Sequence, residues 1–172
     1  MLDQVFKSRR VYFLVLLLFF FSGCARNSWH YSSLDFAEPS FFSSKIACSS
    51  SNDPYVEFEI VRSETATQAW INFLTYKAQP LEDHPDLTPA TLSIDDHIET
   101  FSASKLKGSQ RILIPQEQTA KILTLLEAGK TVQMTLSGIE ISLDPKGFKK
   151  AYKKLTAPLP KISLPSFGID WS

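Results

Sequence analysis

The sequence has little of what marks enzymes and nucleic-acid-binding proteins. Its 18 lysines and arginines balance 18 acidic residues, so the formal net charge is zero. A chain without excess positive charge has no electrostatic basis for binding nucleic acid, and we expect no such partner. Neither a glycine-rich phosphate loop nor a Gly-x-Ser-x-Gly elbow occurs. The signatures of nucleotide-binding proteins and of one large hydrolase class are therefore missing.

Histidine is also scarce: the chain has His30, His84 and His97. No two of them have the spacing of a zinc site on a helix or a loop. Asp83 beside His84, and the Asp-Asp-His run at residues 95–97, could form an acid–base or metal-binding group. Acidic residues beside a histidine in a loop are more often a solvated turn. We therefore predict no catalytic residue, no metal and no cofactor, and a protein that is not an enzyme.

The first 23 residues have the pattern of a secretory signal helix. Lys7, Arg9 and Arg10 give a basic start, an apolar run fills residues 11–21, and two small residues precede Cys24. The run is shorter than the roughly 20 apolar residues that a membrane-spanning helix needs. These features are typical of a leader that is removed from the mature protein. An ordinary signal peptide with a chance cysteine, or an uncleaved anchor, is the alternative.

The segment Phe21-Ser22-Gly23-Cys24 resembles the bacterial lipobox, which has leucine where this chain has Phe21. The resemblance implies cleavage before Cys24 and a diacylglyceryl group plus an N-acyl chain on that cysteine, which together anchor a protein durably to a membrane. Ala25 stands where an aspartate commonly retains such proteins in the inner membrane, so we expect the outer membrane, facing the periplasm. With Cys24 lipidated, Cys48 has no disulfide partner, and we expect a small buried side chain there.

Removing the leader, residues 1–23, leaves 149 residues with a net charge of −2, enough for one domain with its own core. We predict a lipidated tether at residues 24–44, a β-rich globular domain at residues 45–155, and an extended, proline-rich tail at residues 156–172. The tail holds too many apolar residues to be a disordered segment. Either the domain itself or a partner must therefore cover it.

Alternating apolar and polar residues predict several strands. In Tyr55–Val61, apolar side chains alternate with Glu57 and Glu59, which places both glutamates on the solvent face of a half-buried strand. Further strands are predicted at residues 69–76, 92–94, 98–101 and 111–114. Loops or turns are predicted at Pro80, Pro85, Pro89, Asp95-Asp96 and residues 107–109.

Residues 131–143 give the clearest local prediction, a hairpin with Ser137-Gly138 as its two-residue turn. A slip of one residue would bring apolar side chains opposite polar ones, so the register is well specified. The expected cross-strand pairs are Leu136 with Ile139, Met134 with Ile141, Val132 with Leu143, Thr135 with Glu140, and Gln133 with Ser142.

Two short helices are also expected. Pro115 suits the first turn of one helix, and Gly129 suits the left-handed position after its end. Asp144 as the N-cap and Pro145 in the first turn predict the start of the second helix. The second helix has one apolar stripe, formed by Phe148, Ala151, Tyr152 and Leu155. Its opposite face carries Lys149, Lys150, Lys153 and Lys154.

This lysine face, together with Trp171 in the tail, is the candidate interaction surface. A run of lysines on an amphipathic helix is usually a solvated face. It could also contact anionic lipid or an acidic partner. Trp70 and Tyr76 are further aromatic residues that could line an interface.

The elements together predict a mainly β protein, an antiparallel β-sandwich or half-barrel with two short helices. The stretch from Ile112 to Leu155 resembles the second half of periplasmic domains of the invasion-associated locus B type. The shared outline is a strand, a helix ending in Leu-Glu-Ala-Gly, a hairpin, and then Gly147-Phe148 with Ala151 and Leu155. It covers about a quarter of the chain. The resemblance implies a β-sandwich accessory protein of the envelope.

The sequence therefore predicts a membrane-anchored envelope lipoprotein that acts as a structural or interaction (accessory) protein. A small-ligand or inhibitor-binding β-domain is the alternative. An enzyme of unknown type is the third hypothesis.

Overall fold

The computed structural model describes residues 28–34, 43–63, 65–94 and 97–158. The predicted leader, Cys24 and Trp171 lie outside the described residues, as do Asp95-Asp96 and most of the predicted tail. The described elements, in chain order, are β1 (His30–Leu34), β2 (Ser43–Ser49), β3 (Val56–Arg62), β4 (Thr67–Phe73), β5 (Leu87–Ile94), β6 (His97–Lys105), β7 (Arg111–Ile114), α2 (Gln116–Glu127), β8 (Val132–Leu136), β9 (Ile139–Leu143) and α3 (Phe148–Leu155).

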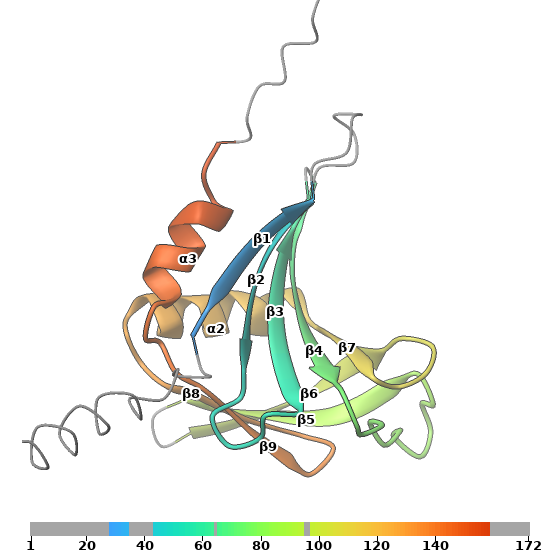
Figure 1. Cartoon of the computed structure of the whole chain (residues 1–172). Coiled ribbons are helices and arrows are strands. Elements are labelled where there is room, and N and C mark those ends of the chain that lie inside the picture. Colours follow the sequence, from blue (N-terminus) through green and yellow to red (C-terminus); the bar gives the residue numbers. More distant parts are fainter. Residues whose placement is uncertain (1–27, 35–42, 64, 95–96, 159–172) are drawn as a thin grey trace, which may run out of the picture.

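All of these strands belong to one antiparallel sheet, in the order β1-β2-β3-β4-β7-β6-β5-β8-β9. The prediction of a mainly β, antiparallel fold with two short helices is confirmed. The sheet is strongly bent, so that β5, β6, β8 and β9 cross beneath β1–β4 (Figure 1). A single bent sheet corresponds to the half-barrel of the two predicted architectures, because a sandwich needs two separate sheets.

One edge of the bent sheet, strand β9, contacts the loop that follows β2. The backbone N–H of Ser51 donates to the carbonyl oxygen of Ser142 in β9 at 2.9 Å. The N–H of Ser142 donates in turn to Oγ of Ser50 at 3.1 Å. These bonds join the last strand to the N-terminal half of the sheet.

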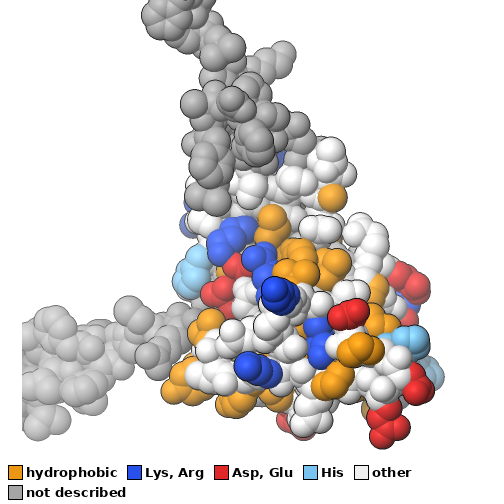
Figure 2. Space-filling model, turned by 90° about the vertical axis from the view of Figure 1, so that its right-hand side faces the viewer, with side chains coloured by type: hydrophobic (Ala, Val, Ile, Leu, Met, Phe, Trp, Pro, Cys, Tyr) orange, Lys and Arg blue, Asp and Glu red, His pale blue; other side chains and the backbone are white. Residues whose placement is uncertain are grey.

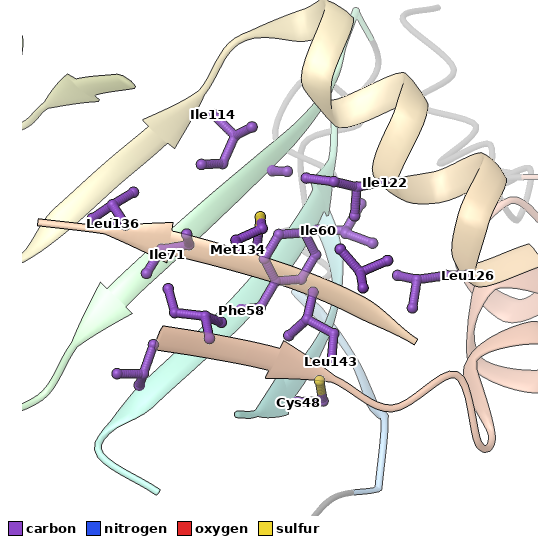
Figure 3. Packing of buried hydrophobic residues seen from close by; sticks show 14 of the residues in the cluster. Cys48, Phe58, Ile60, Ile71, Ile114, Ile122, Leu126, Met134, Leu136 and Leu143 are labelled. Carbon is purple, nitrogen blue, oxygen red and sulfur yellow. The ribbon is translucent and has the colours of Figure 1, made fainter. Parts of the chain in front are cut away.

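The core lies between the bent sheet and the two helices. Side chains from β3, β4, β7, β8, β9 and α2 point into one interior, among them Phe58, Ile71, Ile122 and Leu143 (Figure 3). Burial of each large apolar side chain stabilises the fold by about 1.5–3 kcal/mol. The largest fully buried side chains are Phe58, Phe73, Phe148, Ile46, Ile60, Ile71, Leu92, Ile112, Ile114, Ile122, Leu126 and Leu136.

Helix α2 crosses from β7 to β8 and contacts β4, β8 and α3. Pro115 is its N-cap, where a missing N–H costs nothing. Gly129 follows its end with a φ of +79°. The N–H groups of Gly129 and Lys130 donate to the carbonyls of Leu126 and Leu125 at 3.1 Å and 2.9 Å. The predicted end of this helix is confirmed, and its first residue is Gln116, directly after the proline that the prediction put in the first turn.

The β8–β9 hairpin has the predicted register, with Leu136 opposite Ile139, Met134 opposite Ile141 and Val132 opposite Leu143. Ser137 and Gly138 have φ values of +53° and +79°. Two positive φ angles are those of the two-residue turn whose twist matches that of the flanking strands. The apolar face of the hairpin is buried except at Ile139, which is partly exposed.

The tether prediction is wrong for His30–Leu34, which is strand β1 and pairs with β2 along its whole length. Trp29, just before it, is 8% exposed and belongs to the core. Ser43 and Ser44 also belong to β2. The sequence of β1 has no apolar alternation from which a strand could be predicted. Its position depends instead on contacts with distant parts of the chain.

The predictions for Pro89 and for Asp144 are also corrected. Pro89 lies inside β5, where its carbonyl oxygen accepts from the N–H of Ser137. The pairing of β8 with β5 begins at Ala90, so the missing N–H of Pro89 falls beyond the end of that ladder. After β9, Asp144 does not cap α3. Its Oδ1 accepts from the N–H of Lys146 at 2.8 Å, which forms a local turn.

Helix α3 consequently begins three residues later than predicted, at Phe148. Gly147 is its N-cap, with a φ of +84° in the left-handed region that glycine tolerates best. Strand β4 ends at Phe73, so Tyr76 lies in the loop that follows it.

Candidate interaction surface

Helix α3 is amphipathic, as predicted. Phe148, Ala151 and Leu155 are buried, and Tyr152 is half-buried with its ring stacked on that of Phe148 at 5.2 Å. The four lysines of the opposite face, Lys149, Lys150, Lys153 and Lys154, are all exposed. Within the described part of the chain, none of the four takes part in an ion pair. They form a positively charged surface, named here the lysine face.

The C-terminal end of α3 is tied to the N-terminal half of the sheet. The ammonium group of Lys154 lies 6.0 Å from the ring centroid of Tyr31 in β1. Arg62 of β3 donates from Nη1 to the carbonyl oxygens of Leu155 and Ala157 at 2.7 Å and 2.9 Å. Leu155 is the last residue of the helix, where the carbonyl has no partner within the helix, and Ala157 follows the helix. Arg62 therefore fixes the C-terminal end of the lysine face against the sheet.

Trp29 ties the segment before β1 to the beginning of α3. Its Nε1 donates to the carbonyl oxygen of Asp144 at 2.9 Å. Its ring meets Phe148 edge to face at 4.8 Å and Phe58 at 6.1 Å. Trp29 lies in the segment that the sequence predicts to be a tether, residues 24–44. No local pattern distinguishes it from the rest of that segment, because all its partners are distant in the sequence.

A second charged group lies on the outer face of the sheet. Glu59 of β3 accepts from Lys45 of β2 and from Arg111 of β7, the latter at 3.2 Å. The guanidinium group of Arg111 also lies 4.6 Å from the ring of Trp70. On the side of the molecule away from α3, basic, acidic and hydrophobic side chains lie intermixed (Figure 2). With the ring of Trp70 against the guanidinium group of Arg111, this group combines charged and aromatic side chains, which are common where proteins bind one another.

The sequence predicts that Glu59 lies on the solvent face of its strand. In the structure the Glu59 side chain is only 5% exposed, because its neighbours cover it. Burial by itself would raise the pKa of this carboxyl group. The hydrogen bond from Lys45, the nearby amide group of Asn72 and the charges of Lys45 and Arg111 outweigh it, so the pKa of Glu59 lies below its usual value. Glu59 therefore remains ionised at neutral pH, and its two basic partners stay half exposed.

The remaining candidates for chemistry are isolated. His30, His84 and His97 are exposed, in β1, in the loop before β5 and at the start of β6. In residues 28–158, apart from the gaps named above, no three His, Cys, Asp or Glu side chains gather as metal ligands. Cys48 is buried, as predicted. Burial, and then the charges of Glu57 and Asp144, raise the pKa of the Cys48 thiol to about 12.

The surface of the described residues has hollows, of which two are relevant to binding. One of about 210 Å³ is lined mostly by hydroxyl and amide side chains of β5 and β8 and by Asn52, Ile98 and Glu140. Another of about 300 Å³ lies between α2 and the end of β5, lined by Ile94, Ala120, Lys121, Thr124 and Leu125. Lys121 is held there by Glu99 at 2.7 Å and by Glu117 at 2.8 Å.

None of the described helices is both long enough and apolar enough to cross a membrane. Comparison with known proteins found no matching family model, no matching curated protein and no matching solved structure. The fold and surfaces therefore define an antiparallel, mainly β domain that exposes a basic helix face. The resemblances to the lipobox and to the invasion-associated locus B type stay predictions from the sequence.

Proposed function

We propose that the chain is a membrane-anchored envelope lipoprotein that acts as a structural or interaction (accessory) protein, on the periplasmic side of the outer membrane. The observation that carries this proposal is the distance along the chain between Cys24 and Trp29, which is five residues. Five extended residues span at most roughly 18 Å. Because Trp29 is already part of the core, a lipid on Cys24 would hold the domain close to the membrane surface.

Exposed groups support a role in interaction more than a role in catalysis. The lysine face and the Trp70–Arg111 pair are accessible, and tryptophan and arginine are enriched where proteins bind one another. Ile98 and Leu74 are large apolar side chains that are 73% and 60% exposed. A protein held at a membrane with such surfaces is suited to contacting other envelope components.

The anchor is tested by replacing Cys24. We expect Cys24→Ser to abolish incorporation of labelled palmitate and to block cleavage between Gly23 and Cys24, because serine offers no thiol for lipid transfer. Cys48→Ala is the matched control, and we expect it to keep both processing steps because Cys48 is buried in the core. Palmitate incorporation that persists in Cys24→Ser would contradict the proposal.

The interaction role is tested by affinity isolation from detergent-solubilised membranes. We expect a variant with His30, His84 and His97 all replaced by alanine to recover the same partners as the natural chain, since each imidazole is exposed and isolated. If cells that carry this variant behave like cells that lack the protein, while circular dichroism shows that the variant is folded, the histidines have a chemical role and the protein is an enzyme.

A further inference from the structure

We propose that the lysine face of α3 rests on the anionic phospholipid headgroups of the membrane that holds the lipid anchor, and so orients the domain. This inference deepens the proposed function and depends on it. Lys149, Lys150, Lys153 and Lys154 would lie toward the headgroup phosphates. The apolar face of α3 is already buried in the domain core. The contact is therefore electrostatic and does not insert the helix into the bilayer.

Charge along the chain is strongly uneven. Residues 144–158 contain five lysines and one aspartate, a net charge of +4, whereas the rest of the chain after the leader has a net charge of −6. The aspartate, Asp144, already accepts from the backbone N–H of Lys146. Basic segments beside a membrane are attracted to anionic lipids, and acidic surfaces are repelled. Of the orientations that a short tether permits, anionic lipid favours the one with α3 against the bilayer.

Trp29, which follows the proposed anchor by five residues, lies beside this face. Trp29 donates to the carbonyl of Asp144 and its ring touches Phe148, so the first residues that the structure describes lie at the beginning of α3. Lys154 lies over Tyr31, only two residues further along β1. In Figure 1, α3 and β1 lie next to each other on one side of the bent sheet. Since Cys24 is at most roughly 18 Å from Trp29, the lysines are within reach of the headgroups.

The experiment uses the mature lipoprotein, reconstituted into vesicles of phosphatidylcholine alone or of phosphatidylcholine with phosphatidylglycerol. An amine-reactive acylating reagent labels accessible lysines, and mass spectrometry reads each position. We expect the lysine face to be labelled at least about threefold less on the anionic vesicles, with the difference lost in about 0.5 M NaCl because salt screens the attraction. Lys77 and Lys107, exposed in loops away from α3, should be labelled equally on both.

Charge reversal supplies the matched comparison. In the variant with Lys150→Glu and Lys154→Glu, the protection of Lys149 and Lys153 should disappear. In the control with Lys77→Glu and Lys107→Glu, it should remain. All four substitutions are at exposed positions, so the fold should be unaffected.

The acyl mass on the peptide that contains Cys24 reports on the anchor separately. If that mass is absent, the proposed function fails. If it is present and the lysines are labelled equally on both kinds of vesicle, the membrane contact is overturned. Protection found in native envelopes but not on anionic vesicles would also overturn it, and would assign the lysine face to an acidic protein partner.

Discussion

The β8–β9 hairpin and strand β1 are both short pieces of the same antiparallel sheet, but different parts of the chain specify them. The hairpin is specified locally, by the turn at Ser137-Gly138 and by apolar residues that alternate on both strands. Strand β1 has no such pattern. It is held by Trp29, whose partners Phe148 and Asp144 lie at the other end of the domain. A strand can therefore be predicted from the sequence where its own residues specify it, as in the hairpin. It cannot be predicted where contacts with distant residues hold it in place, as in β1.

The largest effect should come from the hairpin. We expect Met134→Asp to destabilise the domain by about 4 kcal/mol or more, because it buries an unpaired carboxylate among apolar side chains. Thr135→Asp is the control one residue along, on the partly exposed face, and should cost within about 1 kcal/mol. Urea unfolding followed by circular dichroism measures both. Equal losses in the two variants would show that the register of the hairpin is wrong.

The next largest effect should come from the residue that holds β1. We expect Trp29→Ala to cost about 3 kcal/mol, because it removes two ring contacts and leaves a cavity in the core. Trp29→Phe keeps a ring but loses the hydrogen bond to Asp144, and should cost about 1 kcal/mol.

Hydrogen exchange sharpens the comparison between the two regions. In Trp29→Ala, the amides of β1 should lose protection while those of the β8–β9 hairpin keep it, because β1 directly follows the tryptophan and the two ring partners of Trp29, Phe58 and Phe148, lie outside the hairpin. Equal loss of protection in both regions would contradict the distinction between them.

Glu59 is an intermediate case, and its effect should be smaller. Its strand is predicted locally, but Lys45 of β2 and Arg111 of β7 set its environment. We expect Glu59→Gln to cost about 1 kcal/mol at neutral pH, through the loss of charged hydrogen bonds. Glu140→Gln, at an exposed position of β9, is the control and should change stability by less than about 0.5 kcal/mol.

The stabilisation by Glu59 should depend on pH in a definite direction. The pKa of Glu59 is lowered in the folded state, so its stabilisation is complete above the unfolded pKa of about 4.3 and is lost as the pH falls through the folded pKa. The advantage of the natural chain over Glu59→Gln should therefore shrink between about pH 5 and pH 3. Unfolding curves at several pH values measure it, and an advantage that grows on acidification would contradict the ion-paired arrangement.

Most of the second half of the fold could be predicted because its signals are local. Pro115 and Gly129 mark the ends of α2, and Ser137-Gly138 sets the hairpin. The errors arise where a neighbouring strand or a local turn gives a residue a different structural role from the one that its own sequence context predicts. Pro89 fits inside β5 only because the β8 ladder starts one residue later. Asp144 forms its own turn with Lys146, which moves the start of α3 to Phe148.

The candidate surface was predicted in part for the same reason. Helical spacing placed Lys149 and its three neighbours opposite the buried stripe without any knowledge of tertiary contacts. The burial of Trp29 and of Glu59 could not be predicted in this way. Each depends on side chains from strands or helices that approach only in the folded molecule.

The hydrogen bond between Trp29 and Asp144 joins residues that are 115 positions apart. It therefore also sets an order of events during synthesis. The first strand leaves the ribosome early, yet Trp29 has no place to be buried until the segment around Phe148 has emerged as well. Closing so long a loop carries a large entropic cost, so we expect this contact to form among the last. Until then the N-terminal segment stays accessible to whatever modifies or carries it.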